Sequence, residues 1–424
     1  MSSKQLGLLM AGLLAVVKFG TAAAPAADNI YYVSTTGSDT NSGAHGQPFR
    51  TINKGVKVLK PGDTLYIRAG TYAEALLNVI PSGTSWHSPV TVAAYPGEEV
   101  TIRPGSGEDV IKFQDNNPAY IIVDGLILDA AGTTAAAVFI TTANAPPTVP
   151  HHIRLKNCEI KNAREQAVMV YSPNVRSRQA DYNEFINLKV HHIGSTRFHH
   201  GLYINTNHNL IDHCEVWDVH GNGIQIYKSK GRNGLNCNDN TVRSCRIHDT
   251  GLDKSDVTAG IVVTVGNGNL VCNNLIWNNN IGVQIDTGAT NTKVYNNTIC
   301  RSFGDAGIRN GYPNPPGARG TIILNNILHQ NTYGNKIRDY GPDMFADYNL
   351  VGNVDPKFVD DAAHDFRLQA DSPAINAGTT LREVTTDCEG VRRPQGKAYD
   401  LGAHGYSSAA AAKAGKDVTG SPKN

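Results

Sequence analysis

Several short segments in the middle of the chain begin with glycine and carry side chains suited to binding and proton transfer. In Gly223–Tyr227, the aliphatic residues Ile224 and Ile226 alternate with Gln225 and Tyr227. Because side chains alternate between the two faces of a strand, we expect the aliphatic residues to point inward and the others outward. One predicted outer row contains Met169, Tyr203, Gln225, Val262, Gln284 and Arg309, and the next contains Tyr171, Asn205, Tyr227, Thr264 and Asp286.

These outer rows have the composition of a carbohydrate-binding surface. Tyrosine rings stack on the apolar faces of sugars, while amide and carboxylate groups hydrogen-bond to sugar hydroxyls. The rows therefore predict a substrate-binding strip that includes Tyr171, Asn205, Gln225, Tyr227, Gln284 and Asp286. The alternative is a row of tyrosines stacked only to stabilise a sheet.

A histidine and a tyrosine at the start of one segment could form an acid–base pair. His200 directly precedes Gly201, and Tyr203 follows on the same predicted strand. Such a pair could remove the proton α to a carboxylate, with Lys228 as an alternative base and Arg309 holding the carboxylate. The alternative is that His200 only hydrogen-bonds the tight turn.

The loops beside the strip are charged. Lys228, Lys230 and Arg232 directly follow Tyr227, and we expect these cations to capture carboxylates of a polymer. A solvated basic loop is the alternative. On the facing side we expect His199 and His220 to contact substrate, and an acidic insertion supplies Asp253 and Asp256 as candidate ligands of a calcium ion. No cofactor is required by the pattern, and the histidines lack the compact spacing of a zinc site.

The elements that position these residues repeat along the chain. One turn position is filled by small or apolar residues at spacings of 30, 26, 31, 29, 23 and 29 residues, which predicts a solenoid with a buried spine. Seven cysteines are present, and a Cys237–Cys272 disulfide stays open as an alternative. The spine residues are Cys158, Leu188, Cys214, Cys245, Asn274, Asn297 and Asn326. A second regular row, predicted to be structural, is His191, Trp217, His248, Trp277, Cys300 and His329.

The bulk composition excludes some partners. The formal net charge is +1, so no global field attracts nucleic acid or a membrane surface. Residues 1–26 predict a secretory signal, with Lys4, an apolar stretch and an Ala24-Pro25-Ala26 site, and no other segment predicts a membrane span. We expect an N-terminal cap over 27–72 with a helix over 48–59 across the open end, a β-helix over 73–350, terminal coils and a closing cap over 351–406, and a disordered tail over 407–424.

Three stretches resemble secreted right-handed parallel β-helix proteins of the pectate-lyase type, including family nine pectate lyases. They are YYVSTTGSDTNSG with PFRTINKGVKVLKPGDTLYIRAGTY within 31–72, HGLYI with NLIDHCEVWDVHGNGIQIY within 200–227, and DFRLQADSPAINAG with YDLGAHGY within 365–406. The resemblance implies an all-β, single-stranded parallel β-helix with three strands per coil. It also implies that the Gly-led strand carries the substrate groove.

The same resemblance implies polysaccharide chemistry. We expect a monomeric lyase that cleaves an acidic, uronic-acid-containing polysaccharide by β-elimination, with Tyr203 or Lys228 as base. A C5-epimerase or a glycoside hydrolase on the same fold is an alternative, as is a non-catalytic carbohydrate-binding adhesin. Family nine lyases use a lysine base beside calcium held by several aspartates, and this sequence does not reproduce that cluster over 200–310.

Overall fold

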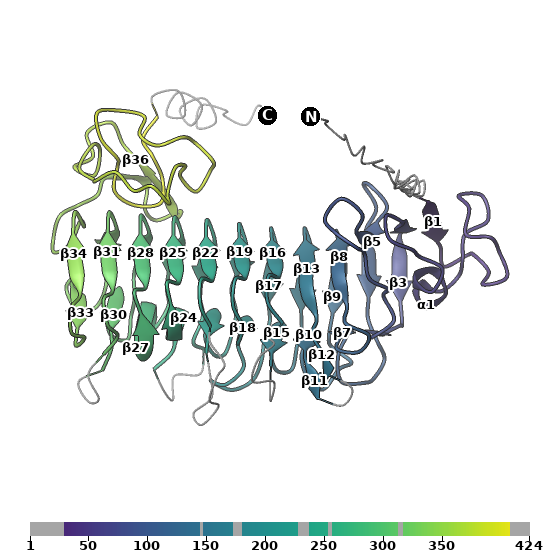
Figure 1. The fold of residues 1–424 in the computed structure, drawn as a ribbon. Helices are drawn as coiled ribbons and strands as arrows, with labels where there is room; N and C mark the ends of the chain where they lie inside the picture. Colours follow the sequence, from purple (N-terminus) through teal and green to yellow (C-terminus); the bar gives the residue numbers. More distant parts are fainter. Residues whose placement is uncertain are drawn as a thin grey trace, which may run out of the picture.

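Three parallel sheets wrap around one elongated core in the computed structural model of the chain (Figure 1). The structure describes residues 29–144, 147–172, 180–227, 237–252, 257–312 and 317–407. Through most of this length, consecutive strands go to sheets A, B and C in turn, so each coil supplies one strand to each sheet. Nearly all the ladders are parallel, which confirms the predicted β-helix.

The bounds of the elements are as follows. Sheet A contains twelve strands: β1 (Ile30–Val33), β2 (Thr64–Ile67), β5 (Val90–Ala94), β8 (Ala119–Asp124), β13 (His151–Lys156), β16 (Glu184–Ile186), β19 (Leu210–Asp212), β22 (Thr241–Arg243), β25 (Leu270–Cys272), β28 (Lys293–Tyr295), β31 (Ile322–Leu324) and β34 (Phe345–Asp347). Sheet B contains ten: β3 (Gly70–Tyr72), β6 (Val100–Ile102), β9 (Ile127–Asp129), β14 (Glu159–Lys161), β17 (Lys189–His191), β20 (Glu215–Val216), β23 (Arg246–His248), β26 (Leu275–Trp277), β29 (Thr298–Cys300) and β32 (Ile327–His329). Sheet C also contains ten: β4 (Leu76–Leu77), β7 (Ile111–Phe113), β10 (Val138–Thr141), β15 (Val168–Tyr171), β18 (Leu202–Ile204), β21 (Ile224–Ile226), β24 (Ala259–Asn267), β27 (Ile281–Thr290), β30 (Ile308–Asn310) and β33 (Ile337–Asp339). Outside these sheets lie α1 (Ile52–Val56), the β11 (Ala143–Asn144) and β12 (Pro147–Thr148) pair, and the β35 (Phe358–Asp360) and β36 (Asp365–Leu368) pair.

Glycines precede the strands of sheet C because adjacent coils approach closely there. A Cβ on Gly201 would lie 2.4 Å from the carbonyl oxygen of Gly223 in the next coil, and one on Gly282 would lie 2.5 Å from that of Gly307. Only a residue without a side chain fits such a contact. The Gly-led motif therefore marks the corner where sheet C begins, and the aliphatic residues after it point into the main core.

The predicted spine lies at the tight turn between sheets A and B. The residue before each spine position has a positive φ, as at Asn157 (54°) and Asn296 (51°), a conformation that asparagine tolerates well. Within the spine, the N–H of Asn274 donates to Oδ1 of Asn297 (3.0 Å), and the N–H of Asn297 donates to Oδ1 of Asn326 (2.8 Å). All seven cysteines are buried free thiols, so the Cys237–Cys272 alternative is not adopted.

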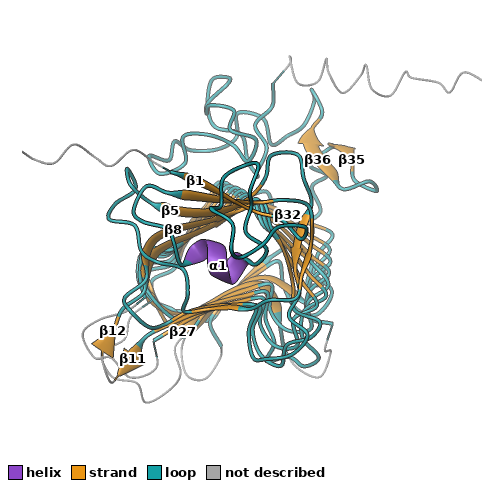
Figure 2. Cartoon of the chain, turned by 90° about the vertical axis from the view of Figure 1, so that its right-hand side faces the viewer, coloured by secondary structure: helices purple, strands orange, loops and turns teal. Residues whose placement is uncertain are grey.

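A short helix covers the N-terminal end of the core. Helix α1 lies across the opening formed by the three sheets, as seen along the stack in Figure 2. Ile52 and Val56 are fully buried, and the Thr51 side chain accepts the backbone N–H of Lys54 as an N-cap. The helix is shorter than the predicted 48–59 because Phe49 forms a β-bridge with Val33. None of the helices in the described part of the chain is long and apolar enough to cross a membrane.

The C-terminal segment lies along the side of the last coils instead of across their end. Phe358, Phe366 and Leu401 pack on Trp277 and on Cys300 of sheet B. Figure 1 shows this segment folded back beside β25 to β34, while β34 ends the stack. Phe345 in β34 is 56% exposed. The predicted closing role for residues 351–406 therefore differs from the observed position, because the segment is held by outward apolar side chains of sheets A and B.

Candidate active site

The predicted outer row lies in register on sheet C. Tyr203 pairs with Met169 and with Gln225, Val262 pairs with Gln225 and with Gln284, and Gln284 pairs with Arg309. The neighbouring Leu202, Ile204, Ile224 and Ile226 are fully buried in the main core. Alternation then places Tyr203, Gln225, Gln284 and Arg309 on the opposite, outer face. The single exterior file expected from the sequence is therefore present.

This file is recessed. The exposed fractions are 9% for Tyr203, 8% for Gln225, 2% for Gln284 and 6% for Arg309. Outward side chains of a solvated sheet keep much larger exposed fractions, so these four are largely shielded from solvent. Polar groups in such surroundings interact more strongly than on an open surface.

Two tyrosines and a histidine gather around Tyr203. Its ring lies 6.5 Å from that of Tyr171, 5.8 Å from that of Tyr227 and 5.9 Å from that of His200, measured between ring centres. The planes of His200 and Tyr203 are within 13° of parallel. Asn205, which is fully buried, donates its Nδ2 to the carbonyl oxygen of Tyr227 (2.6 Å) and so fixes the end of the neighbouring strand.

His200 is buried and held by the next coil. Its Nδ1 accepts the backbone N–H of Asn222 at 3.0 Å, so the proton of the neutral ring lies on Nε2. Burial, assisted by His199, lowers the pKa of His200 to about 3. The ring is therefore neutral near pH 7 and offers one N–H donor. This hydrogen bond with Asn222 is the kind of contact expected under the alternative in which His200 only hydrogen-bonds the tight turn.

The two other predicted histidines lie on the same edge of sheet C. The Nδ1 of His199 accepts the backbone N–H of Ser195 (3.0 Å), and burial lowers the pKa of His199. His199 and His220 are both partly exposed. They can reach a ligand at this edge without the movement that His200 would need.

A second group of polar residues lies farther along the file. Gln284 donates Nε2 to Oδ1 of Asp286 (2.7 Å), and Arg309 donates Nη1 to Oδ2 of Asp305 (2.7 Å). Burial raises the pKa of Asp286, against the opposing effects of Gln284 and Arg309. Among the described residues, Oε1 of Gln284 and both Nε and Nη2 of Arg309 are buried without a hydrogen-bond partner. Unpaired buried atoms of this kind are costly.

The two groups are too far apart to act on one sugar. Arg309 is on β30 and Tyr203 on β18, with three strands between them. Four strand spacings of about 4.8 Å separate the two positions by about 19 Å. The structure thus brings Tyr171, His200, Tyr203, Gln225 and Tyr227 together, and it places Gln284, Asp286 and Arg309 at a separate position.

Five predicted residues lie outside the described part of the chain. They are Lys228, Lys230 and Arg232 after Tyr227, and the candidate calcium ligands Asp253 and Asp256. Among the residues that the structure describes, no three His, Cys, Asp or Glu side chains gather to hold a metal ion.

Two contributors to these groups were missing from the sequence-based prediction. Asn222 donates Nδ2 to Oε1 of Gln225 (2.9 Å), while its N–H holds His200. Arg338 extends the outer file, because it pairs in register with Arg309. Its signal was present, since Ile337-Arg338-Asp339 repeats the pattern of Ile308-Arg309-Asn310.

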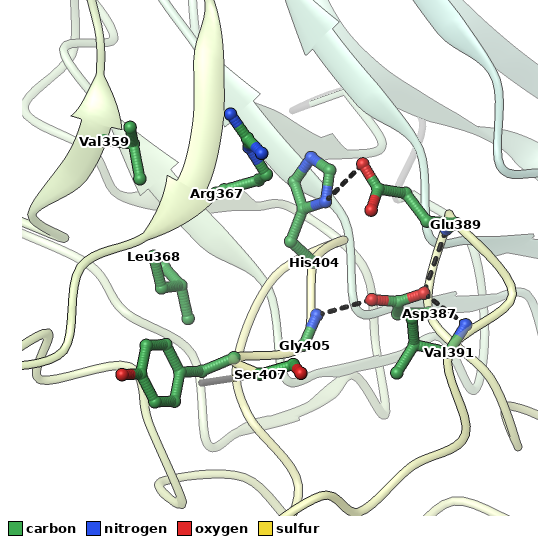
Figure 3. A pocket seen from close by; sticks show the side chains of 10 residues that line it. Val359, Arg367, Leu368, Asp387, Glu389, Val391, His404, Gly405 and Ser407 are labelled. Atoms are coloured by element: carbon green, nitrogen blue, oxygen red, sulfur yellow. Dashed lines mark hydrogen bonds and ion pairs between the residues drawn. The ribbon is translucent and has the colours of Figure 1, made fainter. Parts of the chain in front are cut away.

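A cavity in the C-terminal segment does not compete with sheet C as a sugar site. Figure 3 shows His404 with the carboxylates of Asp387 and Glu389 around it. His404 Nδ1 lies 3.7 Å from Oε1 of Glu389, and Asp387 accepts the N–H of Gly405 (2.9 Å). The volume is about 30 Å³, which has room for a water molecule or two but not for a saccharide.

Comparison with known proteins shows that the chain is similar to one family model and to two proteins. Residues 31–199 match the model described as "Pel9A-like, right handed beta helix region". The chain is 24% identical over 428 residues to the uncharacterized protein YwoF of Bacillus subtilis, an alignment that covers 93% of this chain and 89% of that protein. It is 36% identical over 90 residues to the pectate lyase PEL9 of Emericella nidulans, covering 20% of this chain and 22% of that enzyme.

The solved structure of pectate lyase Pel9A is similar over most of its length. The TM-score is 0.67 at 18% identity, and the match covers 90% of this chain and 97% of that one. At this identity the likeness concerns the fold. The chain therefore has a right-handed parallel β-helix fold similar to that of pectate lyase Pel9A, and its residues 31–199 match the Pel9A-like family model.

Proposed function

We propose that this protein is a secreted polysaccharide lyase that cleaves a uronic-acid-containing polymer by β-elimination beside Tyr203. The observation that carries the proposal is the cluster of Tyr171, His200, Tyr203 and Tyr227 on the outer face of sheet C. Aromatic rings and amide groups along one file suit a linear sugar chain. The similarity to pectate lyases supports the same class of substrate.

In the proposed reaction, Tyr203 takes the proton from C5 of the uronic acid. The C4–O4 bond breaks, a double bond forms between C4 and C5, and the departing O4 receives the proton from the hydroxyl of Tyr203, which returns to its starting state. His200, as a neutral Nε2–H donor, would orient the tyrosine or the sugar rather than carry a proton itself. Gln225 and Tyr227 would position the ring, with His199 and His220 at the edge of the site.

The negative charge that develops on the carboxylate must be neutralised near Tyr203. Arg309 is about 19 Å away by strand count, so it cannot serve this sugar. Lys228, Lys230 and Arg232 follow Tyr227 directly in sequence, and we propose these cations for the role. Lys228 also remains the alternative base, and calcium bound with Asp253 and Asp256 the alternative neutralising group.

The test is to incubate the protein with pectate, alginate, glucuronan and glycosaminoglycans, each with and without a chelator. A rise in ultraviolet absorbance from unsaturated uronate is the expected result, and its loss with chelator would assign a metal. Shorter chains without absorbance would indicate a hydrolase, and altered sugar composition at constant length an epimerase. Binding without any of these changes would support an adhesin and contradict the proposal.

A further inference from the structure

Two arginines and one aspartate form a cluster at the far end of the outer file. Asp305 accepts Nη1 of Arg309 through Oδ2 (2.7 Å) and Nη1 of Arg338 through Oδ1. Arg309 and Arg338 occupy the same outer position on the adjacent strands β30 and β33. One carboxylate thus bridges two guanidinium groups, and these three ionised groups together carry one positive charge.

The other carboxylates in this neighbourhood are already engaged. Asp286 accepts Nε2 of Gln284, and Asp339 accepts Nδ2 of Asn310 (2.8 Å) and the N–H of Gly341 (2.9 Å). Arg309 is 6% exposed, and its Nε and Nη2 have no hydrogen-bond partner among the described residues. Hydrogen bonds from neutral donors leave the charges of these carboxylates in place, so a ligand carboxylate would be held by guanidinium donors and not by an excess of positive charge.

Aromatic rings frame the accessible arginine. The Arg338 side chain is 38% exposed, and its guanidinium carbon lies 4.4 Å from the ring centre of Tyr333 and 5.8 Å from that of Tyr340. Tyr333 itself is 50% exposed. A cation stacked on an exposed tyrosine offers hydrogen bonds for a carboxylate and an apolar surface for a sugar ring in one place.

We infer that Arg338, supported by Asp305 and Arg309 and flanked by Tyr333, forms a remote subsite for a uronic acid residue of the polymer. The subsite lies on β33, five strand spacings from Tyr203 on β18, which is about 24 Å along the stack. It therefore contacts a sugar several residues away from the bond that breaks. This inference rests on the proposed function only for the identity of the polymer.

Such a subsite favours long chains over short ones. A chain long enough to reach from Tyr203 to Arg338 gains one charge-assisted contact, while a disaccharide at Tyr203 gains none. We expect Arg338→Gln to weaken the binding of an acidic octasaccharide about tenfold, the equivalent of one such contact. The binding of the disaccharide is expected to be unchanged.

The binding test is done with Tyr203→Phe protein, so that turnover does not consume the ligand. Titration calorimetry uses a disaccharide and an octasaccharide of galacturonate and of mannuronate, with neutral malto-octaose for comparison. Arg246→Gln is the matched control, because Arg246 also combines a carboxylate, Glu215, with an aromatic ring, Trp277, but lies on sheet B. Arg338→Lys tests whether the planar guanidinium is needed.

Selective loss of octasaccharide affinity in Arg338→Gln, with Arg246→Gln unchanged, supports the subsite. The subsite would be overturned if Arg338→Gln bound the octasaccharide as tightly as Arg246→Gln, or if it lost affinity equally for the octasaccharide and the disaccharide. It would also be overturned if the protein bound no acidic oligosaccharide. If the wild-type protein releases no unsaturated product but Arg338→Gln still loses binding, the lyase proposal fails while the subsite stands.

Discussion

Two rows of outward side chains run along the same β-helix and differ in how their aromatic rings are arranged. On sheet B, His191, Trp217, His248 and Trp277 stack face to face, with ring centres between 4.2 and 6.0 Å apart and planes within 23°. On sheet C, the ring of Tyr203 is tilted against those of Tyr171 and Tyr227, and buried atoms of Gln284 and Arg309 lack hydrogen-bond partners among the described residues.

His248 of the sheet B row and His200 beside the sheet C file differ in their charged neighbours, although burial lowers the pKa of His191 on sheet B as well. On sheet B, burial opposes charge on His248, but the Asp249 and Glu215 carboxylates outweigh it and raise the pKa of His248. On sheet C, no carboxylate appears among the causes that lower the pKa of His200 to about 3. A regularly repeated row of aromatic side chains therefore reflects the repeat of the coils and does not by itself indicate a binding site. Because Nε1 of Trp277 on sheet B is also buried without a hydrogen-bond partner among the described residues, the candidate for binding is identified by the tyrosine cluster around Tyr203 and not by unpaired atoms alone.

The largest expected effect is on turnover, which should depend on the sheet C file and not on the sheet B row. Tyr203→Phe removes the proposed base but keeps the ring, so we expect turnover to fall by about 10²- to 10⁴-fold, the usual contribution of general acid–base catalysis. The thermal transition is expected to stay near that of the wild type. Initial rates of unsaturated-uronate release and a calorimetric scan measure both quantities.

A matched variant on the same file is Gln225→Glu, which keeps the side-chain shape and leaves Tyr203 in place. Its turnover is expected to exceed that of Tyr203→Phe. Full activity in Tyr203→Phe would remove Tyr203 from the proposed reaction and leave Lys228 as the base to test.

The next effect should appear in stability alone. Trp277 is 2% exposed and packs against His248 on one side and Phe366 of the C-terminal segment on the other. Trp277→Ala should lower the free energy of unfolding by about 3–5 kcal/mol, as is typical for a buried aromatic residue. Activity per folded molecule should not change. Denaturant titration and a rate normalised to folded protein test this, and a selective loss of activity would contradict the structural assignment.

The sequence predicted the faces of the strands well, because period-two alternation depends on local residues. Ile224 and Ile226 predict one face of β21, and the Gly201 and Gly223 positions mark the same corner in successive coils. The register of Tyr203 with Gln225 followed from that repeat. Arg338 was overlooked although Ile337-Arg338-Asp339 repeats Ile308-Arg309-Asn310, because Lys336 precedes the segment where Gly307 leads the earlier one.

Contacts between coils could not be predicted in the same way. His200 is held by the backbone of Asn222 in the next coil, and the residues around position 200 do not predict that contact. The place of the C-terminal segment had a faint signal. Leu275 and Ile327 are apolar at outward positions of sheet B, and such positions on a solvated face predict a covering element.

The smallest expected effect concerns pH and tests the environment of His200. Its folded-state pKa of about 3 lies below the ordinary value near 6.5, so the unfolded chain binds more protons between these values. Stability contributed by the neutral ring is thus present above pH 6.5 and is lost as pH falls toward 3. In His200→Asn, whose Oδ1 can still accept the N–H of Asn222, the decline in unfolding free energy between pH 6 and 4 should be shallower by up to about 1.4 kcal/mol per pH unit.

Equilibrium unfolding at several pH values measures the slope, with His404→Asn as a comparison, since burial also lowers the pKa of His404, to about 4. An identical slope in wild type and His200→Asn would mean that the ring titrates normally, which would return His200 to the role of a proton-transferring partner of Tyr203.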